Sequence, residues 1–208
     1  MNYSSFFDLV IFDCDGVLVD SEPLVNRVYV EMLGELGYTL DYSACLSEFA
    51  GAAMTTRLQA FTDRFGWVAP PEFPALFQER LYEAMTRELR PVVGVKDALS
   101  CTSGSRCVAS NGNRGEIVFR LNTCDLMSHF GDAIFSGTEV SRPKPYPDVF
   151  LAAAAAFGVA PSRCAVIEDS LTGVQAAVRA GMNVFWLCRT CGCSLIRKSR
   201  SYRIFLNG

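Results

Sequence analysis

Four segments of the sequence carry acidic, hydroxyl and basic side chains that could act together in chemistry. They are Asp13-Cys14-Asp15-Gly16, Ser110-Asn111-Gly112, Ser141-Arg142-Pro143-Lys144-Pro145 and Glu168-Asp169-Ser170. Clustered carboxylates repel one another, and a divalent cation with oxygen ligands neutralises them. The acids of these segments therefore predict a Mg²⁺ site that receives a phosphate ester. The candidate metal ligands are the four acids Asp13, Asp15, Glu168 and Asp169, of which Mg²⁺ typically takes one or two.

The two aspartates of the first segment are the candidate catalytic residues. A carboxylate that attacks phosphorus forms an aspartyl-phosphate, and a second acid can protonate the leaving alkoxide and later activate water. Asp13 and Asp15 suit these two roles, because a spacing of two residues at a strand end lets both side chains reach one pocket. Gly16 lets the chain turn away without placing a side chain there.

The other segments offer donors for the oxygens of a phosphate group. A hydroxyl, an amide and an ammonium group can each donate a hydrogen bond to phosphate. We therefore expect Ser110, Asn111 and Lys144 to bind phosphate. For Asn111, an equal alternative is that the amide shapes the turn.

Short apolar runs must position these segments. Five runs have the length of a strand and are continuously apolar, as expected for strands covered on both faces: 9–12, 107–109, 133–135, 164–167 and 184–187. Three helices are predicted between the last four runs: 114–121, 148–157 and 171–180. This alternation is typical of an α/β protein with a Rossmann-like, doubly wound parallel sheet, in which sites form beyond the carboxyl ends of the strands.

A long interval with a helical pattern separates the first run from the second. Apolar residues recur at helical spacing after Pro23, and helices are expected over 24–36, 54–65 and 73–89. We therefore expect residues 1–18 and 92–208 to form the core and residues 19–91 to form an inserted small α-helical cap domain. Within the core, residues 188–208 form an atypical tail.

Composition narrows the classes of partner. With 208 residues, 50% of them hydrophobic and a net charge of −3, the chain indicates a well-filled globular fold without the basic surface that binds nucleic acid. No apolar run is long enough for a membrane span, and no basic region precedes the first apolar run as it does in a secretory signal. We expect a cytoplasmic monomer that binds a small phosphorylated metabolite, with no nucleic-acid or membrane partner. The single histidine, His129, is expected to be a partly exposed packing residue.

The four segments resemble the motifs of the haloacid dehalogenase superfamily. The stretch from Asp13 to Glu22 is similar to the first motif, Ser110 to the second, Lys144 to the third and 168–170 to the fourth. Order and spacing agree over residues 8–187. The helical insertion after the first motif resembles the helical-cap subfamily of sugar-phosphate phosphatases and β-phosphoglucomutase-like hydrolases, including phosphatases of the 6-phosphogluconate type.

The resemblance implies a role for each residue. Asp13 would be the nucleophile and a metal ligand, and Asp15 the acid/base, with its backbone carbonyl on the metal. Ser110 and Lys144 would hold the phosphate. Asp169 would be a further magnesium ligand, and Glu168, beside it, would act through water. These roles predict a Mg²⁺-dependent phosphatase acting on a small phosphorylated sugar or sugar acid.

Two alternatives to this function remain open. A β-phosphoglucomutase-like phosphomutase is disfavoured, because the histidine and arginine of the mutases correspond here to Val25 and Met54. The other is a phosphate-ligand-binding protein that has lost catalysis, for which the unusual tail is the support.

The tail and the cap hold the weaker candidates. Cys188, Cys191 and Cys193 could bind zinc, but three local thiols favour an irregular tail instead. Cap residues near Gly51 and Arg57 are expected to select the substrate, although Arg57 could equally be a solvated helix residue.

Overall fold

The computed structural model describes residues 7–49, 52, 54–102, 104–187, 193–198 and 201–206, the last two ranges by their backbone. The chain divides into two compact units. One unit, the helical unit, is Ser21–Leu89, and the other consists of Met1–Asp20 together with Arg90–Gly208.

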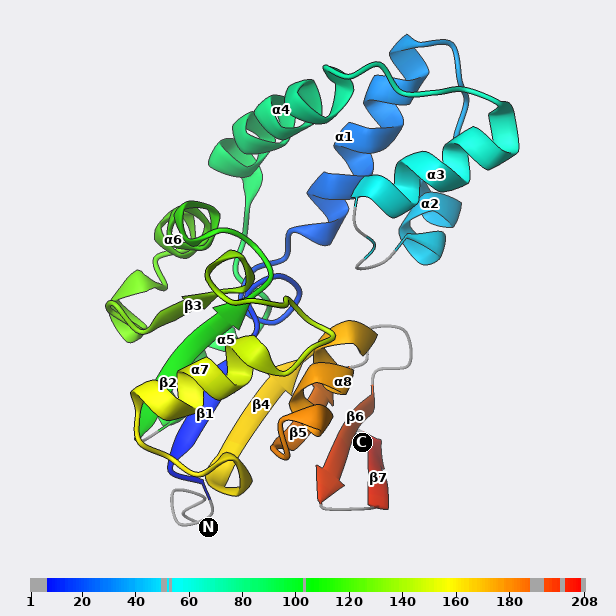
Figure 1. Cartoon of the computed structure of the whole chain (residues 1–208). Coiled ribbons are helices and arrows are strands. Elements are labelled where there is room, and N and C mark those ends of the chain that lie inside the picture. Colours follow the sequence, from blue (N-terminus) through cyan, green and yellow to red (C-terminus); the bar gives the residue numbers. More distant parts are fainter. Residues whose placement is uncertain are drawn as a thin grey trace. The chain divides into compact units, whose positions relative to one another are not determined.

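A mixed sheet forms the centre of the second unit (Figure 1). Its strands lie in the order β3-β2-β1-β4-β5-β6-β7. Their bounds are β1 Leu9–Phe12, β2 Ser105–Ser110, β3 Ile134–Ser136, β4 Cys164–Glu168, β5 Asn183–Leu187, β6 Cys193–Lys198 and β7 Ser201–Leu206. Because β1 to β5 pair in parallel with β1 in the middle, the predicted Rossmann-like, doubly wound sheet is confirmed.

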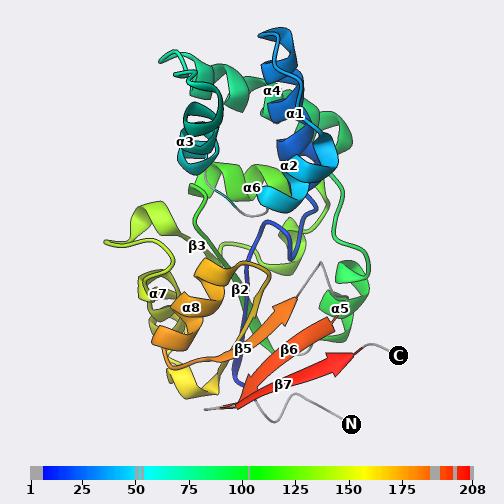
Figure 2. The ribbon, with the colours of Figure 1, turned by 90° about the vertical axis from the view of Figure 1, so that its right-hand side faces the viewer.

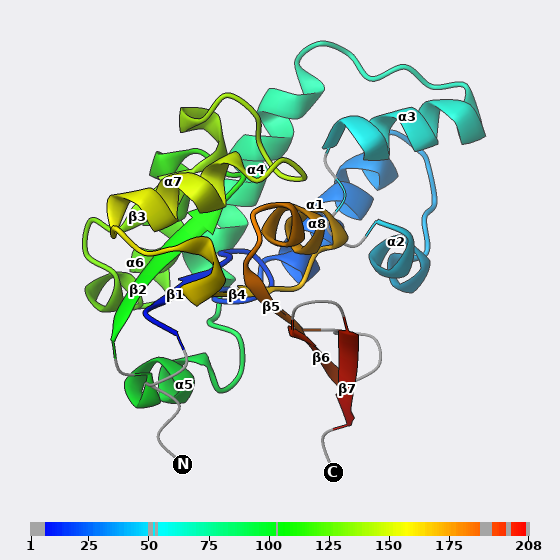
Figure 3. The same ribbon diagram turned by 60° about the horizontal axis from the view of Figure 1, so that its bottom comes forward.

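Helices cover both faces of this sheet. Those of the same unit are α5 Val95–Cys101, α6 Arg114–Thr123, α7 Asp148–Ala156 and α8 Leu171–Arg179, with 3₁₀ turns η2 Met127–His129, η3 Gly137–Glu139 and η4 Pro161–Arg163. Figures 2 and 3 show α7 and α8 on one face and α5 on the other. Small side chains such as Ala153 and Ala177 are buried between these helices and the strands, so the helices pack closely on the sheet.

The register of the sheet aligns the ends of its central strands. Phe12 of β1 lies opposite Val108 of β2 on one side and Ile167 of β4 on the other. Residues that follow Phe12 and Ile167 therefore leave the sheet side by side. This places the first and fourth acidic segments together.

The described part of the atypical tail forms strands, so the prediction of an irregular tail was wrong there. Its backbone forms β6 and β7, which pair antiparallel with each other, and β6 pairs antiparallel with β5. An uncovered β5 would expose unpaired N–H and C=O groups, and added strands satisfy them. Cys188 and Cys191 lie outside the described residues, as does the side chain of Cys193, so the zinc alternative stays a prediction.

The helical unit consists of α1 Glu22–Glu35, α2 Tyr42–Glu48, α3 Met54–Phe65 and α4 Phe73–Glu88, labelled in Figure 1. Helix α1 packs against both α2 and α4. An aromatic cluster links α3 to the residues around it and consists of Phe61 and Phe65 of α3 together with Tyr38, Trp67 and Phe73. Among the described helices, none is both long and apolar enough to cross a bilayer.

Arg57 of α3 is buried, so the alternative that it is a solvated helix residue was wrong. Its side chain is 1% exposed. The guanidinium donates to Asn26 Oδ1 at 2.8 Å, to the Phe49 carbonyl at 2.7 Å and to the Ala52 carbonyl at 3.2 Å. Phe49 ends α2, where helix carbonyls lack partners within the helix, and Arg57 supplies one.

Replacing this side chain tests its structural role. We expect Arg57→Met to lower the free energy of unfolding by about 3 kcal/mol, because buried carbonyls would lose their donor. Denaturant unfolding of the purified protein measures the change. The matched control is Arg64→Met on the same helix, whose pair with Glu48 is exposed and should contribute at most about 1 kcal/mol. Equal losses in the two variants would contradict this role.

Candidate active site

Asp13 and Glu168 emerge from neighbouring strands, β1 and β4, at the carboxyl edge of the sheet. The Asp13 amide continues the strand pairing by donating to the Ile167 carbonyl at 3.0 Å. Asp13 is 8% exposed and Glu168 is fully buried. Two carboxylates buried this far from solvent need a cationic partner.

Lys144 supplies that partner from the loop before α7. Its Nζ donates to Asp13 Oδ1 at 2.5 Å, to Glu168 Oε1 at 2.6 Å and to the Ala109 carbonyl at 2.9 Å. The side chain is 3% exposed, and Nζ lies 4.8 Å from the centre of the Phe150 ring. All three ammonium hydrogens are therefore engaged.

The charges of this cluster do not balance. Burial raises the pKa of Asp13 well above its usual value, and Lys144 opposes the shift while Glu168 adds to it. For Lys144, burial lowers the pKa, but Asp13 and Glu168 together raise it above the usual lysine value. When both carboxylates are ionised, one ammonium between them leaves a negative charge, which either a proton on Asp13 or a further cation would neutralise.

Glu168 is anchored on its other side by Ser170. Its Oε2 accepts from the Ser170 amide at 2.8 Å and from the Ser170 hydroxyl at 2.9 Å. The same hydroxyl oxygen accepts from the Gly173 amide at 3.0 Å and so caps α8. A Cβ at Gly173 would collide with the Glu168 carboxylate. The first turn of α8 thus leaves room for the buried acid only because Gly173 has no side chain.

Asp169 completes a group of acids that could hold a metal ion. Asp13, Glu168 and Asp169 each offer one carboxylate oxygen, and these oxygens lie within 4.8 Å of one another. The indole of Trp186 donates to the Asp169 carbonyl at 3.0 Å. Gly16 has a φ of +79°, and a Cβ there would collide with the Asp169 carboxylate. Oxygen donors in a site with more carboxylates than cationic side chains fit Mg²⁺.

The predicted phosphate donors lie on the loops beside this group. Ser110 ends β2, is 3% exposed, and its Oγ accepts from the Gly112 amide at 3.2 Å. The Asn111 amide is bonded to the backbone of Lys144: its Oδ1 accepts from the Lys144 amide at 2.8 Å, and its Nδ2 donates to the Lys144 carbonyl at 3.2 Å. Asn111 thus ties the second and third segments together.

Asp15 has different surroundings from the other acids. It is not part of the three-carboxylate group, its side chain is 33% exposed, and its Oδ1 lies 3.4 Å from Nε of Arg120 on α6. Arg120 and Trp186 were not predicted from the sequence, because each lies within a regular helix or strand and no motif singles it out. His129 is half-buried in η2, as predicted.

Comparison with known proteins agrees with this architecture. Residues 7–181 match the family model for haloacid dehalogenase-like hydrolases. The 6-phosphogluconate phosphatase of Escherichia coli K12 is 32% identical over 185 residues, which cover 88% of this chain and 84% of that protein. Fructose-1-phosphate phosphatase YqaB of the same strain is 30% identical over 175 residues, covering 84% and 93%.

Solved structures of this family also superpose on the chain. A conserved haloacid dehalogenase-like protein of unknown function from Agrobacterium tumefaciens gives a TM-score of 0.80 at 36% identity, covering 86% of this chain and 81% of that one. A HAD family hydrolase from Deinococcus radiodurans, with bound phosphate and sodium, gives 0.74 at 34% identity, covering 86% and 80%. The fold, the acidic edge and these matches together show that the chain belongs to the haloacid dehalogenase-like hydrolases.

Proposed function

We propose that the chain is a Mg²⁺-dependent phosphatase that hydrolyses a small phosphorylated sugar or sugar acid through an aspartyl-phosphate on Asp13. The observation that carries the proposal is the buried Asp13 carboxylate, held by Lys144 and lying beside Asp169. Relatives named as phosphatases of 6-phosphogluconate and fructose-1-phosphate support the substrate class.

The metal would be held by the acidic group. Asp13 and Asp169 are the proposed side-chain ligands, and Asp15 contributes its backbone carbonyl. Glu168 acts through water, because its two oxygens already accept hydrogen bonds from Lys144 and Ser170. When bound, Mg²⁺ supplies positive charge that stabilises the phosphoryl group in the transition state.

In the first proposed step, Asp13 attacks the phosphorus atom. A bond forms between an Asp13 carboxylate oxygen and phosphorus, and the bond from phosphorus to the sugar oxygen breaks. The leaving alkoxide takes the proton of the Asp15 carboxyl group, so a neutral alcohol departs. Lys144 holds Asp13 in place for this attack and offsets the negative charge of the phosphate.

In the second step, Asp15 acts as a base. Its carboxylate takes a proton from a water molecule, the water oxygen bonds to phosphorus, and the bond from phosphorus to Asp13 breaks. Inorganic phosphate leaves, and Asp15 is again protonated. The Ser110 hydroxyl accepts from Gly112, which leaves its own proton to donate to the phosphate in both steps. Asn111 contributes by fixing the Lys144 loop, with its amide as a further phosphate donor.

We also propose that residues 19–91 act as a cap that selects the substrate. Arg57 is not available for that purpose, since its guanidinium is bonded inside the helical unit. Other residues of the cap would contact the sugar.

The free thiols of Cys14, Cys107 and Cys164 fit a reducing compartment such as the cytoplasm.

Removal of the nucleophile tests the mechanism. A panel of sugar phosphates and phosphorylated sugar acids, assayed for released phosphate with and without Mg²⁺, identifies a substrate. On that substrate we expect Asp13→Asn to lower kcat by at least about 10³-fold. Asp8→Asn, which changes an exposed acid beside the same strand, should retain activity. Normal turnover by Asp13→Asn would refute the mechanism, and an isomerised instead of a dephosphorylated product would identify the phosphomutase.

Metal binding provides a separate test. In the metal-free protein the pKa of Asp13 is raised above the ordinary 3.8, so stability falls as the pH rises from that value towards the raised one. Mg²⁺ would replace the proton, and at 100 times its Kd it would add about 2.7 kcal/mol of stability. We therefore expect Mg²⁺ to raise the Tm more at about pH 8 than at about pH 5.

Variants of the acids check where the ion binds. Asp169→Asn should abolish the Mg²⁺-dependent rise in Tm, whereas Asp97→Asn, an exposed acid of α5, should leave it unchanged. A rise in Tm that survives Asp169→Asn, or that is larger at the lower pH, would contradict this metal site.

A further inference from the structure

Arg120 is a nearly buried cation beside Asp15 that the proposed mechanism does not use. Its side chain is 12% exposed, its Nε lies 3.4 Å from Asp15 Oδ1, and its Nη1 lies 3.7 Å from Glu116 Oε2. Neither nitrogen has a hydrogen-bond partner among the residues that the structure describes. An arginine with unsatisfied buried donors is destabilising, so its place beside an acid points to a role in function.

Gly112 provides the space that Arg120 occupies. A Cβ at Gly112 would lie 3.1 Å from Arg120 Nη1 and 3.2 Å from Glu116 Oε2, which is tighter than nine in ten contacts of real Cβ atoms. Gly112 is also the residue whose amide donates to Ser110. The loop that carries the proposed phosphate donor therefore packs directly against this guanidinium.

Helix α6 holds Arg120 firmly. The helix starts with a capping box, in which Asn113 Oδ1 accepts from the Glu116 amide at 2.9 Å and Glu116 Oε2 accepts from the Asn113 amide at 3.3 Å. Ile117 and Leu121 of the same helix are fully buried and fix it on the sheet. Glu116 is thus immobilised, and it lies one helical turn before Arg120.

The charge of Arg120 is maintained by its neighbours. Burial lowers the pKa of the guanidinium, but the Asp15 carboxylate, followed by Cys14 and Glu116, raises it overall. The group therefore faces Asp15 as a permanent cation.

We propose that Arg120 is a positioning residue for Asp15, holding the acid/base in reach of the leaving oxygen during the first chemical step. This inference rests on the proposed phosphatase function. A general acid must lie within hydrogen-bond reach of the oxygen that it protonates, and a misplacement of about 1 Å lowers a rate about 10²-fold. Asp15, which is one third exposed, gains a defined position from a cation mounted on a rigid helix.

The test compares two leaving groups. A sugar phosphate releases an alkoxide that needs a proton, whereas 4-nitrophenyl phosphate releases a stable anion that does not. The ratio kcat/KM reports substrate binding and the transfer of the phosphoryl group to Asp13, so it leaves out the later hydrolysis of the aspartyl-phosphate, in which Asp15 acts as a base. We expect Arg120→Met to lower kcat/KM for the sugar phosphate at least about 10-fold more than for 4-nitrophenyl phosphate.

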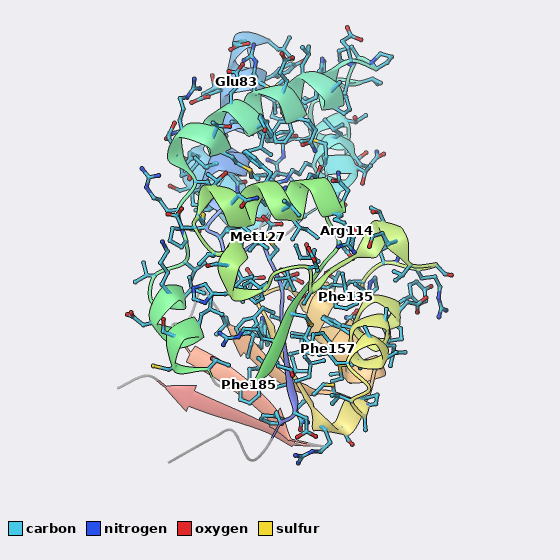
Figure 4. All side chains as sticks on the ribbon, turned by 90° about the vertical axis from the view of Figure 1, so that its left-hand side faces the viewer. Glu83, Arg114, Met127, Phe135, Phe157 and Phe185 are labelled. Carbon is cyan, nitrogen blue, oxygen red and sulfur yellow. The ribbon has the colours of Figure 1, made fainter. Side chains whose placement is uncertain are left out.

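Three further variants serve as controls. Arg114→Met removes an exposed arginine at the start of the same helix, labelled in Figure 4, whose partner is Glu139, and should match the wild type on both esters. Arg120→Lys keeps the positive charge and should recover part of the kcat/KM that Arg120→Met loses on the sugar phosphate. In an Asp15→Asn background, Arg120→Met should have no further effect on the sugar phosphate. Should Arg120→Met fail to fold, Arg120→Lys carries the two-ester comparison.

Equal losses on both esters, or no loss on either, would overturn the positioning role of Arg120 while leaving the phosphatase function intact. A wild-type protein that hydrolyses neither ester would overturn the proposed function and this inference with it.

Discussion

The Lys144 ammonium lies between the carboxylates of Asp13 and Glu168, and much of the remaining site is arranged around this contact. Each of its three hydrogens has an acceptor: Asp13 directly after β1, Glu168 at the end of β4 and the Ala109 carbonyl on β2. A single charged atom thus connects the ends of three neighbouring strands. Removing it would leave two buried carboxylates without a counter-charge, which is among the more destabilising changes that a core can undergo. The same shortage of positive charge makes the edge suitable for a divalent cation.

Glycines at this edge of the sheet matter as much as the charged side chains. Gly16, Gly112 and Gly173 each lie where a Cβ would press on a charged group, namely the Asp169 carboxylate, the Arg120 guanidinium and the Glu168 carboxylate. Backbone without side chains lets loops from three strands approach the same small volume. The acids are therefore held at close range by the packing of the loops, and a bound cation would not have to assemble them.

Much of this architecture could be predicted from the residues alone. Continuous apolar runs identified the five parallel strands, and polar residues directly after them identified the acidic edge, because parallel strands share a carboxyl end. The buried state of Arg57 could not be predicted, since it depends on the end of α2 and on Asn26, which helical periodicity does not bring together. The contacts of Arg120 and Trp186 could not be predicted for the same reason, because their partners lie far away in sequence. The pairing of β6 with β5 depends on an open sheet edge, which the composition of the tail does not reveal.

The aspartyl-phosphate mechanism can be tested by trapping the phosphoryl group on the protein. In Asp15→Asn, 4-nitrophenyl phosphate can still phosphorylate Asp13, because its leaving group needs no proton, but the base for the second step is missing. Acid quenching followed by mass spectrometry should find one phosphoryl group on the protein, located at Asp13, after one equivalent of nitrophenolate has been released. Release of many equivalents without an adduct, or an adduct at another residue, would contradict the account.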